Sequence, residues 1–108
     1  MNTSDRYALL LHRIVAVRLL VDPEKVIRIA KANVARWIAR SDPNDPYIRS
    51  YFEWKTILES YSPEEIRRLI LREDDEGQFL RSTTPFAGIV SRDERIAVLR
   101  ECEEIGFV

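Results

Sequence analysis

The chain has 108 residues, with 17 Lys and Arg against 18 Asp and Glu, one Cys, one His, three Gly and five Pro. This length suits one domain that buries about two thirds of its unfolded surface without added crosslinks. One Cys and one His exclude a Cys/His zinc site and an intrachain disulfide, and no basic excess points to bulk nucleic-acid binding. We therefore expect a single globular domain over residues 1–108 that needs no metal or cofactor.

The chain shows no signal for a membrane or for export. No stretch approaches the roughly 18 to 20 apolar residues of a membrane span, because Arg13 and Arg18 interrupt the most apolar region. The first six residues lack the basic region and unbroken apolar core of a secretory signal. A single Cys is typical of a reducing compartment. We expect a cytoplasmic protein with no membrane partner.

Four segments carry residues that begin helices, either an oxygen-bearing N-cap followed by Pro or a capping box. They are Asp22-Pro23-Glu24, Asp45-Pro46, Ser62-Pro63-Glu64-Glu65, and Ser91 with Glu94. A further start near Thr3 or Ser4 gives an opening helix that reaches about Val21. No segment alternates apolar and polar residues as a half-buried strand does. The sequence predicts an all-α fold, a single compact bundle of five or six helices.

The opening helix is apolar nearly all round. One stripe holds Tyr7, Leu10, Leu11, Ile14, Val17 and Val21, and a second stripe holds Ala8, Val15 and Leu19. Such a helix is central in a bundle or faces a second chain. We expect the first helix to be central and the second stripe to be buried, within the bundle or at a homodimer seam.

The later helices are predicted to be amphipathic. From Asp22 to Arg40, apolar residues share one face and the opposite arc is basic: Lys25, Arg28, Lys31, Arg36 and Arg40. The third helix carries an aromatic stripe at helical spacing: Tyr47, Tyr51 and Trp54. Residues 73–80 continue the fourth helix or begin another, and the last helix carries Ile96, Leu99 and Cys102. Residues 81–90 are predicted to be the one long irregular connection.

Few residues offer catalytic chemistry. His12 lies between apolar neighbours in mid-helix, so we interpret it as structural, with a functional imidazole as the alternative. Acidic neighbours would raise the pKa of the Cys102 thiol, which favours a packing role. The three glycines are isolated, so a phosphate-binding loop is missing. We therefore predict a non-enzymatic protein without catalytic residues.

Charge is distributed unevenly along the chain. Residues 1–40 hold eight basic and three acidic side chains, a balance of +5, and the other 68 residues hold nine basic and fifteen acidic, a balance of −6. The acidic run Glu73-Asp74-Asp75-Glu76 lacks the alternating oxygens of a calcium loop, so it predicts a solvated turn or helix cap. Either the two halves neutralise each other on packing, or the chain is an adaptor with one basic and one acidic face.

The segment from Arg81 to Arg95 reads RSTTPFAGIVSRDER. Pro85 keeps the preceding residue extended, Phe86 and Ile89 are suited to anchor the loop on the bundle, and Gly88 permits a left-handed turn. We expect Phe86 to be buried and the loop to be a structured plug.

This segment resembles the C-terminal motif of a group of small bacterial helical proteins, which read (S/T)-x-PFAG, an apolar pair, Ser or Thr, and then Glu-Arg. An opening helix with His-Arg-x-Val-Ala, an Asp-Pro before a helix with Trp37, and the Ser62-Pro63 start are similar to that group in order. Genes of the group often stand beside predicted toxin genes of the nucleotidyltransferase or PIN-nuclease type. The resemblance implies an antitoxin-like component and a partner protein, with no reaction of its own.

We expect a protein-binding module that restrains a partner toxin encoded by a neighbouring gene. Its contacts are predicted in the acidic run and the loop: Glu73, Asp74, Asp75, Glu76, Pro85, Phe86 and Gly88. One alternative is a helical DNA-binding regulator that uses the five basic residues of the second helix, although a sequence pI of about 5.9 disfavours nucleic acid. The other is a small ligand-binding bundle with an apolar pocket beside Tyr51 and Trp54.

Overall fold

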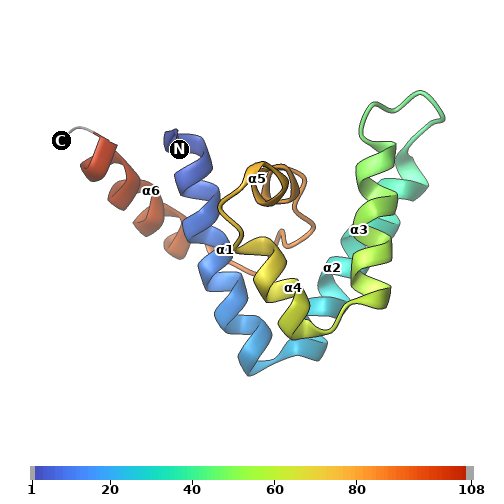
Figure 1. Ribbon diagram of the computed structural model, residues 1–108, viewed down its shortest axis with the longest axis horizontal. Coiled ribbons are helices and arrows are strands. Elements are labelled where there is room, and N and C mark those ends of the chain that lie inside the picture. Colours follow the sequence, from blue (N-terminus) through green and yellow to red (C-terminus); the bar gives the residue numbers. More distant parts are fainter. Residues whose placement is uncertain (1, 107–108) are drawn as a thin grey trace.

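The computed structural model describes residues 2–106, and these form six α-helices and no strand. The helices are α1 (Thr3–Val21), α2 (Pro23–Arg40), α3 (Ile48–Ser60), α4 (Pro63–Ile70), α5 (Asp75–Ser82) and α6 (Arg92–Gly106) (Figure 1). The predicted all-α class and helix number are confirmed. Within this part of the chain, no helix has the length and apolar character needed to cross a bilayer.

Local capping explains where most helices begin. Ser62 and Glu65 exchange the two hydrogen bonds of a capping box at α4, and Ser91 and Glu94 do the same at α6. The Asp22 carboxylate accepts a hydrogen bond from the N–H three residues later at the start of α2. These side chains satisfy backbone N–H groups that a helix leaves unpaired at its first turn, so the sequence predicts these starts correctly.

Two boundaries differ from the sequence prediction. The Asp45 carboxylate accepts a hydrogen bond from the Tyr47 N–H at 2.8 Å, which stabilises a turn that delays the start of α3 to Ile48. Pro46 therefore stands ahead of the helix and not at its first position. Asp74 caps a new helix, α5, which includes Arg81. The irregular connection is accordingly residues 83–91.

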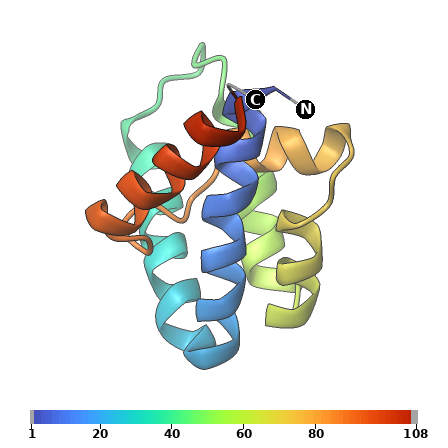
Figure 2. The same ribbon diagram turned by 90° about the vertical axis from the view of Figure 1, so that its left-hand side faces the viewer.

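Helix α1 lies at the centre of the molecule. Helices α2, α4, α5 and α6 all pack against it (Figures 1 and 2). Of the second predicted stripe, Val15 and Leu19 are buried and Ala8 is half-buried. The first helix is therefore central, as the sequence predicts.

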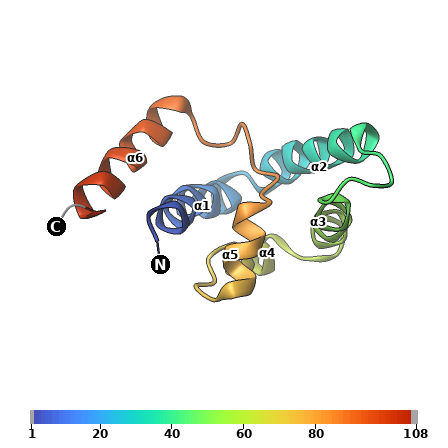
Figure 3. The same ribbon diagram turned by 90° about the horizontal axis from the view of Figure 1, so that it is seen from above.

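The remaining helices lie on different sides of α1. Helix α3 packs chiefly on α2, and the two form a hairpin that projects from the rest of the molecule (Figure 3). Helix α6 packs chiefly on α1, through Val98 and Cys102. The predicted apolar residues Ile96 and Leu99 are instead largely exposed. Val98 and Cys102 are one turn apart and share the face toward α1. The packing role predicted for Cys102 is confirmed, whereas Val98 was not predicted.

Candidate functional site

Residues 83–91 connect α5 to α6, and we call them the clasp loop. Two helices of the projecting hairpin hold the first part of this loop with polar side chains. The Asn33 amide of α2 donates hydrogen bonds to the carbonyls of Pro85 at 2.8 Å and Ala87 at 3.0 Å. The Trp54 indole of α3 donates to the Thr83 hydroxyl at 3.1 Å. Because these partners satisfy loop groups that face the interior, the loop packs as a structured plug.

Arg18 of α1 fastens the other end of the clasp loop. Its guanidinium donates to the Ile89 carbonyl at 2.9 Å and to the Glu94 carboxylate at 2.6 Å. The hydrogen bond from Arg18 lowers the pKa of Glu94 to about 2, and the Ser91 N–H acts in the same direction. Glu94 therefore serves two purposes, since it completes the capping box of α6 and joins that helix to α1.

His12 joins α1 to the clasp loop from inside the protein. Its Nδ1–H donates to the Ala8 carbonyl at 2.6 Å, because a carbonyl can only accept. The neutral Nε2 then accepts a hydrogen bond from the Thr84 hydroxyl at 2.8 Å, and that hydroxyl accepts from the Phe86 N–H. Burial lowers the pKa of His12 to about 4. The imidazole is thus neutral and structural, which agrees with the preferred interpretation of the sequence.

Phe86 anchors the clasp loop in the core. Its side chain is 4% exposed and packs edge-on against Trp54, with ring centroids 5.6 Å apart. A second edge contact joins it to His12, with a centroid separation of 6.2 Å. The predicted burial of Phe86 is confirmed. Pro85 is buried as well, so two of the three loop residues predicted to meet a partner face the interior.

Gly88, the third of those residues, forms the exposed turn of the clasp loop. Its φ is +91°, a conformation that L side chains rarely adopt. An added Cβ would meet no atom within 4 Å. The backbone angle, and not crowding, therefore favours glycine here, as the predicted turn requires.

An uncovered apolar patch lies at the carboxyl end of α1. Val17, Leu20 and Val21 form this elbow patch, and they are 57%, 60% and 80% exposed. Their spacing places them on one side of the helix. A hollow of about 400 Å³ extends from Val17 and Val21 to Gly88 and Ile89 of the clasp loop. The structure therefore brings the exposed turn of the motif beside the largest uncovered part of the first apolar stripe.

The acidic run is a helix cap, one of its two predicted roles. Asp74 accepts a hydrogen bond from the Gly77 N–H at 2.9 Å, and Arg72 forms ion pairs with Asp74 and Glu76. These hydrogen bonds hold the pKa of Asp74 below its ordinary value. All four residues of the run are exposed, and Glu73 and Asp75 form no ion pair with another described side chain. Among the described residues, no group of three or more His, Cys, Asp or Glu side chains is placed to hold a metal ion.

The five basic side chains predicted on α2 are all exposed, and none forms an ion pair with another described side chain: Lys25, Arg28, Lys31, Arg36 and Arg40. They lie along one half of the α2 surface, as helical spacing predicts. Lys25 borders the hollow beside the elbow patch, whereas Arg28 and Lys31 border a second hollow beside Pro63. Arg36 donates to the Asn33 carbonyl oxygen and thereby supports the amide that holds the clasp loop.

The predicted aromatic stripe is divided among three environments. Trp54 is fully buried beside Phe86. Tyr51 packs on Trp37 of α2, with ring centroids 5.6 Å apart. Tyr47 precedes α3 and is exposed. Trp54 and Tyr51 therefore serve the core and the contact between α2 and α3.

Arg81 is a buried residue that the sequence analysis missed. Its guanidinium donates to the carbonyls of Ile70 and Arg72 and closes the turn between α4 and α5. Its Nε and Nη2 have no hydrogen-bond partner among the described side chains and backbone groups, and burial lowers the pKa of Arg81. The residue nearest in sequence that could have indicated this close turn is Gly77, where an added Cβ would clash with the Arg72 carbonyl oxygen. Close packing at this turn therefore requires glycine.

Comparison with known proteins gives no match. No protein-family model, no curated protein and no solved structure matches this chain. The function is therefore inferred from the surfaces described above.

Proposed function

We propose that the chain is a non-enzymatic protein-binding module that restrains a partner enzyme of the toxin type, the class of partner that the antitoxin resemblance implies. The elbow patch is the observation that supports this proposal best. Three aliphatic side chains stand largely exposed, and two of them, Val17 and Val21, line the hollow that reaches the turn of the clasp loop. Apolar patches of this kind commonly mark protein contacts, because covering apolar surface contributes about 25 cal/mol per Å².

The elbow patch is also held in place before a partner arrives. It lies on the central helix, and the adjoining loop is fastened by Asn33, Arg18 and His12. A surface that is already ordered loses little conformational entropy on binding. The position of the clasp loop therefore supports a binding role for the region around its exposed turn.

The acidic run supports partner binding less directly. Arg72 already neutralises Asp74 and Glu76, and Asp74 is occupied as a helix cap. Glu73 and Asp75 are exposed and form no ion pair with another described side chain. Exposed charges outside a contact act at long range and change the association rate more than the affinity.

Co-purification with the products of the neighbouring genes tests the proposal. Val21→Glu places a charge on the elbow patch, and the chain should still fold because Val21 is 80% exposed. We expect this variant to bind the partner at least about tenfold more weakly. The control is Leu99→Glu, which places the same charge on an exposed apolar residue of α6 and should bind as the unmodified chain does.

Three outcomes would contradict the proposal. One is the absence of any bound neighbouring gene product, and another is an equal loss in both variants. The third is self-association of the pure chain that Val21→Glu abolishes while no neighbouring product is captured, since this would assign the elbow patch to a homodimer.

A further inference from the structure

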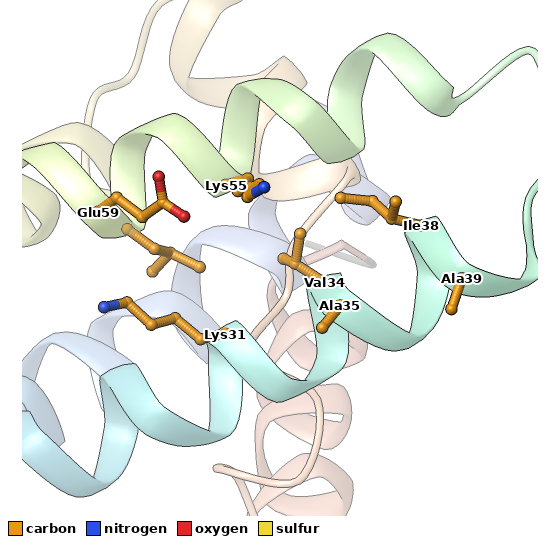
Figure 4. Close-up of a pocket in the computed structure, with 8 residues that line it drawn as sticks. Lys31, Val34, Ala35, Ile38, Ala39, Lys55 and Glu59 are labelled. Atoms are coloured by element: carbon orange, nitrogen blue, oxygen red, sulfur yellow. The ribbon is translucent and has the colours of Figure 1, made fainter.

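A groove runs along α2 on the side away from the elbow patch, bordered by α3 over one part of its length and by Pro63 of α4 over the other. Two adjoining hollows of about 410 and 630 Å³ share Lys31 and together extend from Pro23 to Ala39. At a rise of 1.5 Å per residue, this segment of α2 is about 24 Å long. Figure 4 shows the part of the α2 groove that lies between α2 and α3.

The floor of the α2 groove is apolar. Ile27, Val34 and Ile38 contribute it from α2, and Leu58 contributes it from α3. Along the same edge of α2, Ala35 and Ala39 have small side chains. Small residues lower the wall of a groove, and the distance between packed helix axes depends on the side chains at the contact. A guest helix could therefore lie close to α2.

The cations of the groove have no partner inside the described part of the chain. Arg28, Lys31 and Lys55 border it without an ion pair. Elsewhere, by contrast, Arg18, Arg67, Arg68 and Arg72 each meet a carboxylate. Two acids, Glu24 and Glu59, also border the groove. Helix α2 as a whole nevertheless carries five cations and one acid, so its surroundings have a positive potential.

We propose that the α2 groove binds an amphipathic helix of a partner protein, with an apolar edge on the groove floor and acidic side chains along the flank that meets Arg28 and Lys31. Such helices enter grooves with apolar residues at positions i, i+3 or i+4, and i+7. The groove length matches about four helical turns. A nucleic-acid duplex has no apolar ridge to pack on the half-buried side chains of Ile27 and Ile38. The site is separate from the elbow patch and does not depend on the proposed function.

The probe is a synthetic 18-residue helical peptide with leucines along one edge and glutamates on the flank. A matched peptide has lysines in place of the glutamates. Fluorescence anisotropy measures the binding of each peptide to the full chain at low and high salt. We expect the glutamate peptide to bind at least about tenfold more tightly, and its affinity to fall as salt increases.

Charge reversals in the chain locate the site. Lys31→Glu with Lys55→Glu reverses two cations of the groove and should weaken binding of the glutamate peptide at least about tenfold. The control, Lys25→Glu with Arg40→Glu, makes the same charge change on α2 outside the groove and should change binding less than about twofold. Ala35→Trp fills the space above the floor and should weaken binding by obstruction alone. Circular dichroism and thermal melts verify that each variant is folded.

Several results would overturn the proposal. These are equal losses in the two double variants, equal affinity for the two peptides, and unchanged binding by a folded Ala35→Trp chain. Binding of duplex DNA that depends on Lys31 and Lys55, with no binding of the glutamate peptide, would instead assign the basic residues of α2 to nucleic acid. A loss of partner binding at the elbow patch leaves all these peptide results unchanged, so the two proposals fail separately.

Discussion

At the scale of single residues, the neutral His12 couples folding to pH. Its pKa is about 4 in the folded chain and close to 6.5 in the unfolded chain. The unfolded chain therefore binds the proton first as pH falls, and the stability is lost between about pH 6.5 and pH 4. Protonation removes the acceptor that Nε2 offers to Thr84 and adds a charge near the buried Arg81. The difference in pKa corresponds to about 3 kcal/mol of unfolding free energy.

Urea unfolding at pH 7 and at pH 4.5 measures this effect. The variant His12→Gln has no titratable group at this position, so its stability should depend less on pH than that of the unmodified chain. The Arg18–Glu94 pair also weakens in acid, but it is present in both proteins and cancels in the comparison. Equal pH dependence of the two proteins would show that His12 is not the source.

The Phe86 side chain should contribute strongly to stability. Because it fills the space between Trp54 and His12, Phe86→Ala leaves a cavity and should lower the unfolding free energy by roughly 3 to 5 kcal/mol. The matched control is Phe79→Ala, since Phe79 is 47% exposed and should lose only about 1 kcal/mol. Denaturant melts compare the two variants. Similar small losses would mean that the clasp loop is a mobile tether.

At the scale of helices, α6 should open more easily than α2 or α3. It packs chiefly on α1 and is joined to the rest of the molecule at its start by the Arg18–Glu94 ion pair. Local opening free energies follow the number of such tertiary contacts. Glu94→Gln weakens both the ion pair and the capping box, so amide hydrogen exchange should quicken throughout α6 and remain unchanged in α3. Equal acceleration in both helices would show that α6 does not open as a separate unit.

Helix starts were predictable because their determinants lie within four residues of each other. The capping boxes at Ser62 and Ser91 are present as predicted. Asp45 followed by Pro46 is also a typical helix start. The Asp45 carboxylate instead accepts a hydrogen bond from the Tyr47 N–H, which stabilises a turn before the helix. The buried face of α6 could not be chosen from its own sequence, because Ile96 and Leu99 are as apolar as Val98. The packing of α6 on α1 decides which of them is covered.

At the scale of the whole molecule, contacts between distant segments account for what the sequence analysis missed. Asn33 lies 52 and 54 residues from the loop carbonyls that it holds, and Arg18 lies 76 residues from Glu94. An Asn or an Arg on a helix has no local pattern that reveals such a partner. Similarly, Arg81 is charged and yet buried, contrary to the usual distribution of charged residues.

The uneven charge of the chain is only slightly neutralised inside the fold. Among the described residues, Arg18–Glu94 is the only ion pair between residues 1–40 and the rest of the chain. The other ion pairs lie within residues 64–76. Close ion pairs therefore join the two halves at one place only, and the exposed cations of α2 are available to a partner.

Hydrogen exchange of the chain with and without the partner enzyme tests the central claim, that the elbow patch and the turn of the clasp loop form the partner-binding surface. The partner should slow amide exchange in residues 17–25 and 87–90, because these segments would be covered. Exchange in residues 73–76 should be unchanged, because the acidic run lies outside the proposed contact. Slower exchange confined to residues 73–76, with residues 17–25 unaffected, would contradict the claim and return the binding site to the acidic run.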